Sequence, residues 1–272
     1  MDERAPVAVL SSRVSELEFL NALHVELLRH DAIDGASSPH ELFQTSTIQA
    51  LLGGAFDGDV TLSELRQHGD LGLGTLNGLD GELIVIDGQV FKAELDCTLS
   101  RPSLESRTPY AVVVPFTPGR EQRLRGPIDT ASLERRLWHQ GDRPSAPTAV
   151  RIDGHFDMVR VRSVQKQAPP YSSLADAIAH EHRLELYDTC GTMAGFCFPD
   201  DLDGIELVGF HLHFVTDSRA CGGHVLDFAL REGTLRIDEA TELHVELPAA
   251  VDPPDHRDPV DQAILRRLEQ ST

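Results

Sequence analysis

The chain has 272 residues, of which 40% are hydrophobic and 25% charged, enough for one large domain or two closely packed domains with a real core. Its formal net charge of −20 argues against a nucleic acid or an anionic membrane surface as a partner, because both require a basic binding surface. The opening MDERAPVAVLSSRVSELEF predicts neither a secretory signal nor a transmembrane helix, and four cysteines without a CxxC pair suit a reducing compartment, so we expect a cytoplasmic protein.

In the first third of the chain, apolar residues at helical spacing predict helices over 13–30 and 40–55, with a loop between them. A short helix is expected near Leu62 to His68, followed by a loop dense in glycine. The segment GELIVIDGQVFKA then alternates around Asp87-Gly88, a strong signal for a β-hairpin.

The middle of the chain begins with YAVVVPF, residues 110–116, which reads as a buried strand. TASLERRLWHQ, residues 130–140, predicts a helix with its N-cap at Thr130 or Ser132. From AVRIDGHFDMVRVRSV onward the pattern is mainly that of strands, interrupted by a short helix at SSLADAIAHEH.

Three further strand segments follow, namely IELVGFHLHFVTD, then HVLDFALREGTLRIDEAT with a turn at Glu232-Gly233, then ELHVELP. A polar linker leads to PVDQAILRRLEQST, a predicted terminal helix. The prediction is an α+β chain of two α/β domains, with mixed sheets and flanking helices in each half. The proposed division places a sheet domain at 1–145 and a second sheet domain at 146–272, the second carrying a metal site on its strands and the tail helix.

The stretch GFHLHFVTDSRACGGH, residues 209–224, contains two histidines one residue apart and a third behind a polar turn. In a strand, His211 and His213 share one face while their apolar neighbours share the other. The turn formers between Thr216 and Gly223 would bring His224 beside them. Three protein ligands with one position left open are the pattern of catalytic zinc, whereas a thiolate from Cys221 would close the site. The alternative is that these histidines are polar residues on a solvated face or in a loop.

Four segments resemble the α-acetolactate decarboxylases, in the same order and over roughly residues 40–248. They are LFQTSTIQALLGGAFDGDVTLSELRQHGDLGLG, LGTLNGLDGELIVIDG, HFDMVRVRSV with PPY, and GFHLHFVTDSRACGGHVLDF. The Ala220-Cys221 pair and the linker at 249–260 depart from the family pattern.

The resemblance implies a zinc-dependent carboxy-lyase that converts 2-acetolactate to acetoin. It implies that His211, His213 and His224 bind Zn²⁺, with Glu82, Arg162 and Glu269 around the metal. It also implies two α/β domains and a homodimer.

The chemistry of the reaction gives each of these residues a role. Loss of carbon dioxide leaves an electron pair that is delocalised as an enediolate, which a zinc ion can stabilise as a Lewis acid. Arg162, favoured over Arg160, can hold the departing carboxylate through two hydrogen bonds. Glu82 can ligate the metal or take the substrate's hydroxyl proton, and Glu269 can deliver a proton to one face of the enediolate.

Three other classes of protein fit the histidine pattern. A cupin-like metal protein would place an acid after the histidine pair, here Asp217, although the expected glutamate is absent. A three-histidine hydrolase or hydratase would use a metal-bound hydroxide. A zinc-stabilised interaction domain would have no catalytic activity.

Overall fold

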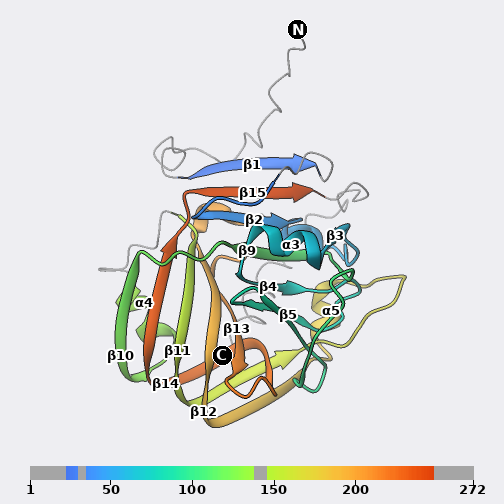
Figure 1. Ribbon diagram of the computed structural model, residues 1–272. Helices are drawn as coiled ribbons and strands as arrows, with labels where there is room; N and C mark the ends of the chain where they lie inside the picture. Colours follow the sequence, from blue (N-terminus) through green and yellow to red (C-terminus); the bar gives the residue numbers. More distant parts are fainter. Residues whose placement is uncertain (1–22, 30–34, 138–145, 248–272) are drawn as a thin grey trace.

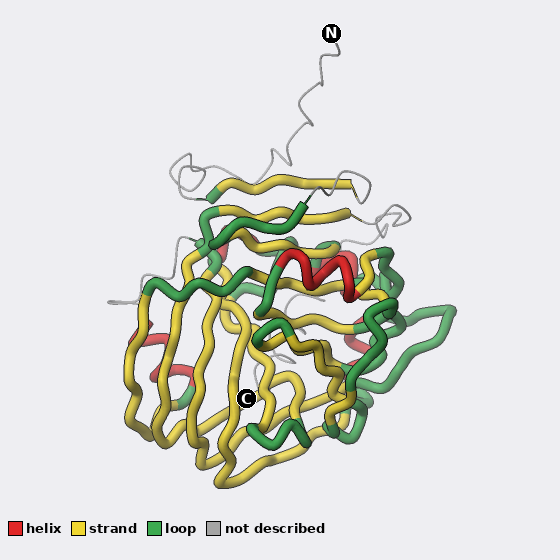
Figure 2. Tube along the Cα trace, in the orientation of Figure 1, coloured by secondary structure: helices red, strands yellow, loops and turns green. Residues whose placement is uncertain are grey.

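The computed structural model describes residues 23–29, 35–137 and 146–247, and strands make up most of it (Figure 2). Two large sheets dominate, one drawn horizontally and one with long vertical strands (Figure 1). No helix in these ranges is long and apolar enough to cross a membrane. The prediction of an α+β chain made mainly of sheets is confirmed, and the first of the two large sheets is mixed.

The first sheet has eight strands, parallel at one end and antiparallel elsewhere. Its β1–β15 and β15–β2 pairs are parallel, and the remaining pairs are antiparallel. In spatial order the strands are β1 (His24–Arg29), β15 (Glu242–Leu247), β2 (Glu41–Thr45), β9 (Tyr110–Val114), β4 (Leu71–Thr75), β5 (Glu82–Ile86), β6 (Gln89–Ala93) and β7 (Leu99–Ser100). A separate pair joins β3 (Val60–Thr61) to β8 (Arg107–Thr108).

The second sheet is antiparallel and closes on itself. Its order is β10 (Arg120–Ile128), β14 (Gly222–Glu239), β11 (Thr148–Ser163), β12 (His182–Phe198) and β13 (Gly209–Thr216). The start of β14 also pairs with β13, with His213 opposite His224. Because β14 pairs with both β11 and β13, the four strands β14, β11, β12 and β13 form a closed ring of paired strands.

The helices are short and sit at the ends of strands: α2 (Ile48–Leu52), α3 (Leu62–His68), α4 (Thr130–Leu137), α5 (Leu174–Ile178) and the 3₁₀ turn η3 (Asp200–Leu202). The predicted α3 is confirmed, and Thr61 with Glu64 forms a capping box at its start. The predicted cap of α4 is wrong: the Asp129 carboxylate accepts a hydrogen bond from the Ser132 amide at 2.8 Å.

The largest core cluster draws on both sheets. Leu73 and Val112 of the first sheet share it with Ala194, Phe196 and Val215 of the second, and all five are fully buried. Burying a side chain of this size stabilises the fold by about 1.5–3 kcal/mol. This shared core packs the central strands of the first sheet against strands of the second, beside the site.

Two of the predicted helices are wrong within the described residues. Residues 24–29, part of the predicted helix 13–30, form β1, which pairs along its length with β15. The segment 40–55 contains strand β2 before the five-residue helix α2. In both cases pairing with β15, some 200 residues away, overrides the local helical spacing.

The hairpin at Asp87-Gly88 is confirmed, with both residues at positive φ, 52° and 67°, between β5 and β6. The turn predicted at Glu232-Gly233 is wrong, because β14 runs unbroken from Gly222 to Glu239. Gly233 lies opposite Gly154 of β11, and this pair of glycines lets the two backbones approach closely.

The predicted division at residue 145 does not follow the division between the sheets. Strand β10 precedes residue 145 but belongs to the second sheet, and β15 follows it but belongs to the first. Neither large sheet lies within one of the two predicted domains, 1–145 and 146–272, and this division of the chain stays a prediction.

Candidate metal and active site

Three histidines converge where β13 meets β14. His211 and His213 alternate on β13, and His213 lies opposite His224. Their ring centroids are 5.1–5.5 Å apart, and one donor atom from each lies within 4.8 Å of the others. All three are buried, at 7%, 0% and 2% exposure. The solvated-face alternative is therefore wrong, and the convergence predicted from the spacing is confirmed.

Two neighbouring features fix this geometry. The Nδ1 atom of His213 lies 2.9 Å from the carbonyl oxygen of Leu83 on β5, and since a carbonyl only accepts, Nδ1 carries the proton. Gly223 has a φ of 157°, and a Cβ there would lie 2.5 Å from the Arg162 carbonyl oxygen. The glycine thus lets β14 approach β11 and sets His224 beside Arg162, its partner in the ladder.

Glu82 opens β5 and points into the same pocket. Its Oε2 lies 3.7 Å from Nε2 of His213, and the residue is 8% exposed. The preceding Gly81 has a φ of 80°, and a Cβ there would lie 2.3 Å from the Ala93 carbonyl oxygen, so the turn before Glu82 requires glycine. The structure places Glu82 beside the histidines, as the family resemblance implied.

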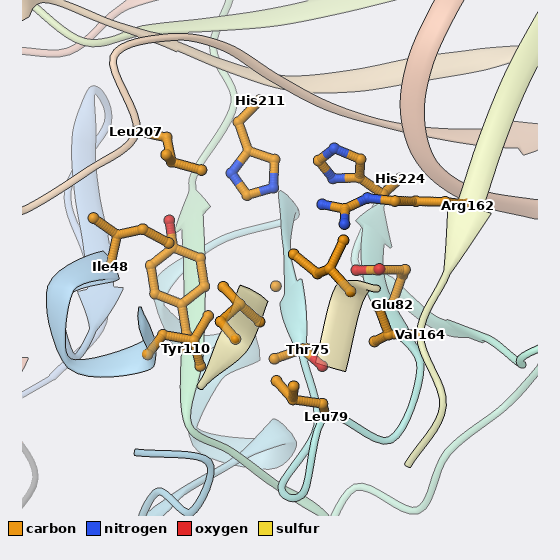
Figure 3. Close-up of a pocket in the computed structure, with 14 residues that line it drawn as sticks. Ile48, Thr75, Leu79, Glu82, Tyr110, Arg162, Val164, Leu207, His211 and His224 are labelled. Atoms are coloured by element: carbon orange, nitrogen blue, oxygen red, sulfur yellow. The ribbon is translucent and has the colours of Figure 1, made fainter. Parts of the chain in front are cut away.

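Arg162 lies on β11 and is 3% exposed. Its guanidinium reaches the space beside His224 and above Glu82 (Figure 3). Nη1 donates to the Glu181 carboxylate at 3.1 Å. Arg160, two residues earlier, forms ion pairs with Glu185 and Asp227 and is not among the residues that line the pocket.

The pocket is small, with a cavity volume of about 50 Å³. Its polar side is formed by His211, His224, Arg162 and Glu82 (Figure 3). The rest of the lining is mostly apolar and comes from Ile48, Leu51, Leu79, Val164, Leu174, Ile178 and Leu207, with Thr75 and Tyr110. The pocket therefore suits a small anion with apolar substituents.

Tyr110 and Glu206 were not predicted from the sequence. The Tyr110 ring lies nearly parallel to His211, with centroids 6.3 Å apart, and its hydroxyl donates to Glu206 at 2.5 Å. Burial raises the pKa of the Glu206 carboxyl to about 8, against the lowering effect of hydrogen bonds from Tyr110 and the Leu207 backbone. Glu206 comes five residues before His211, but nothing in the local pattern distinguishes it from an exposed loop acid.

The donor set fits a metal ion. Three buried imidazoles with one tautomer fixed by a backbone carbonyl, and a carboxylate at their edge, make a typical nitrogen-rich metal site. Cys221 is not part of this group of ligand atoms in the described structure. Glu41, Glu242 and His244 form a second, partly exposed group on the first sheet. The predicted Glu269 lies outside the described residues.

Comparison with known proteins reveals extended similarity. A family model described as alpha-acetolactate decarboxylase matches residues 42–253. The alpha-acetolactate decarboxylase of Methanosarcina mazei is 38% identical over 232 residues, 85% of this chain and 80% of that protein. The enzyme of Klebsiella aerogenes is 35% identical over 222 residues, 80% of this chain and 85% of that protein.

A solved structure agrees with the fold. The crystal structure of alpha-acetolactate decarboxylase from Bacillus subtilis strain 168 superposes with a TM-score of 0.80 at 32% sequence identity. The match covers 85% of this chain and 100% of that chain.

Proposed function

The chain belongs to the α-acetolactate decarboxylase family and is a carboxy-lyase, and from this premise we propose that it decarboxylates 2-acetolactate to acetoin with one bound Zn²⁺. The observation that supports the metal is the buried group of His211, His213 and His224 beside Arg162 and Glu82. Nitrogen donors of this kind, with room left for substrate, suit zinc.

In this proposal His211, His213 and His224 hold the zinc ion as neutral imidazoles. Because these ligands carry no negative charge, they do not offset the positive charge of the ion. When bound, zinc would supply Lewis-acid stabilisation of the negative charge left on the substrate's oxygens as carbon dioxide departs. Leu83 supports this arrangement by keeping the proton of His213 on Nδ1, so that Nε2 faces the site.

Arg162 binds the substrate's carboxylate in this proposal. The guanidinium is almost fully buried and lines the pocket next to His224. A planar guanidinium can hold both carboxylate oxygens and orient the bond between C1 and C2 for cleavage. Since carbon dioxide is neutral, this contact weakens once the bond breaks, which favours release.

In this proposal the carboxylates of Glu82 and Glu269 transfer protons. Breaking the C1–C2 bond moves its electron pair into an enediolate, and a proton must then reach C2 to give acetoin. Glu82, at the edge of the histidine group, is in place to accept the hydroxyl proton or to contact the metal. We assign delivery of the proton at C2 to Glu269 of the tail, on the basis of the family resemblance. Delivery to one face would give a single enantiomer.

The remaining proposals concern the assembly. We propose a cytoplasmic homodimer that acts on a small molecule, without nucleic acid or membrane partners. The support is the formal net charge of −20, together with the family resemblance.

The decisive experiment is a colour assay for acetoin after incubation of the purified protein with fresh 2-acetolactate, with metal analysis in parallel. We expect acetoin formation and about one zinc per chain. Iron in place of zinc would favour a cupin-like protein. Zinc without acetoin would favour a three-histidine hydrolase or hydratase, or a zinc-stabilised domain without catalysis.

A further inference from the structure

Two arginines stand directly opposite each other on β11 and β12, and one of them, Arg162, lines the pocket. In the antiparallel pair of β11 and β12, Arg162 is the partner of Arg183. Directly opposed residues share a face of the sheet, and two like charges in that position destabilise each other. The side chain of Arg162 is 4% exposed, whereas that of Arg183 is 53% exposed.

Glu181 connects these two arginines. Its Oε2 accepts from Nη1 of Arg162 at 3.1 Å, and its Oε1 accepts from Nε of Arg183 at 2.5 Å. The Glu181 side chain is only 6% exposed, so the attraction is weakly screened by water. The two arginines and Glu181 together carry a formal net charge of +1.

Glu181 is also tied to the apolar wall of the pocket. Its amide donates to the carbonyl oxygen of Ile178, the last residue of α5, at 2.9 Å. Leu174 and Ile178 of that helix line the pocket. The segment that supports the arginine therefore also carries part of the surface facing the substrate's apolar groups.

We propose that Glu181 is a positioning residue for the substrate's carboxylate: it offsets the repulsion between Arg162 and Arg183 and holds the Arg162 guanidinium at the pocket. This inference rests on the proposed function for the identity of the carboxylate. Glu181 accepts a hydrogen bond from Nη1 of a guanidinium that also lines the pocket.

The same two strands offer a matched control. Arg160 and Glu185 are also cross-strand partners, with Nε of Arg160 donating to Glu185 at 2.9 Å, but their side chains are 30% and 39% exposed. Ion pairs in such exposed positions contribute little. Glu185→Gln removes the same charge from β12, at a residue that does not line the pocket.

The test compares Glu181→Gln with Glu185→Gln and the wild type. For Glu181→Gln we expect KM for 2-acetolactate to rise about tenfold, with kcat, zinc content and melting temperature nearly unchanged. Inhibition by acetoin should change less than about twofold, because acetoin has no carboxylate for Arg162 to bind. For Glu185→Gln we expect all of these values to stay close to those of the wild type.

Two further measurements separate positioning from a structural role. Calorimetric titration with lactate, a 2-hydroxy acid that is not decarboxylated, should show about tenfold weaker binding to Glu181→Gln, whether or not the protein turns over acetolactate. Adding Arg183→Gln to Glu181→Gln removes the repulsion and should recover part of that loss. An unchanged KM and lactate affinity in Glu181→Gln, or equal losses for lactate and acetoin, would overturn the proposal. Absence of acetoin from the wild type would instead reject the proposed function.

Discussion

His213 of the second sheet and Leu83 of the first are joined by a hydrogen bond of 2.9 Å from the imidazole Nδ1 to the backbone carbonyl. The bond links β13 to β5, the strand that begins with Glu82. One contact therefore fixes the tautomer of a proposed metal ligand and joins the strand that carries Glu82 to the strand that carries His211 and His213.

The histidine group gives the first prediction. Replacing His211, His213 or His224 by Ala should remove bound zinc and acetoin formation together, because two imidazoles bind the ion far more weakly than three. Zinc is measured by elemental analysis after dialysis. Full zinc content in any one variant would remove that histidine from the ligand set.

The two arginines of β11 give a matched pair. Arg162→Lys should lower kcat/KM by at least about tenfold while zinc is retained, because an ammonium keeps the charge but not the planar pair of donors. Arg160→Lys should have little effect, since Arg160 forms surface ion pairs with Glu185 and Asp227. Steady-state kinetics on both variants would contradict the assignment if the larger loss fell on Arg160.

Glu82→Gln should lower acetoin formation by about a hundredfold, the usual scale for loss of a positioned acid or base. The amide keeps the size of the side chain but cannot take up a proton. Zinc analysis of the same sample distinguishes the two roles: retained zinc indicates proton transfer, and lost zinc indicates a ligand. Turnover equal to that of the wild type would exclude both roles.

The tail is tested by deleting residues 259–272 and, separately, by Glu269→Gln. If Glu269 delivers the proton to C2, both changes should reduce acetoin formation by at least about a hundredfold and leave zinc content unchanged. Chiral chromatography of the residual acetoin should show a loss of enantiomeric purity. Unaltered turnover in Glu269→Gln would transfer the proton delivery to Glu82.

The raised pKa of the Glu206 carboxyl predicts that the stability of the fold depends on pH. Its carboxyl pKa is about 8 in the folded protein against a reference value of 4.5, so the folded state holds the proton more tightly. The free energy of unfolding should therefore fall as pH rises between these values, by an amount on the order of a few kcal/mol. Glu206→Gln removes this dependence and should match the wild type near pH 5 but exceed it near pH 8.

Denaturant unfolding at several pH values measures this difference. Glu105→Gln, at an exposed position on the same chain, serves as the control and should leave the pH profile unaltered. A constant offset between Glu206→Gln and the wild type across the pH range would contradict the prediction.

The local sequence pattern was sufficient to predict that the three histidines converge. The alternation of His211 and His213 and the turn before His224 depend on residues close in sequence, and the structure has both. The short helix α3 and the Asp87-Gly88 hairpin were predicted for the same reason. Arg162 and Glu82 were placed through the family resemblance, and the pocket contains both.

These local patterns do not predict contacts between residues that lie far apart in the sequence. The strands β1 and β2 have helical spacing, and they are strands because β1 pairs with β15 and β2 pairs with β15 and β9. Tyr110 donates to Glu206, 96 residues further along the chain, and Glu181 accepts from Arg162, 19 residues before it on β11. Such partners are not encoded in the neighbouring residues, so a single sequence carries no signal for them.

The position of β15 between β1 and β2 has a consequence for synthesis on the ribosome. The first sheet cannot be completed until residues 242–247 emerge, about 200 residues after β2. Until then β1 and β2 lack their common partner, and their open edges can pair with other nascent chains. We therefore expect slow folding, and aggregation of chains truncated before residue 242, which expression of such truncations with a solubility assay would reveal.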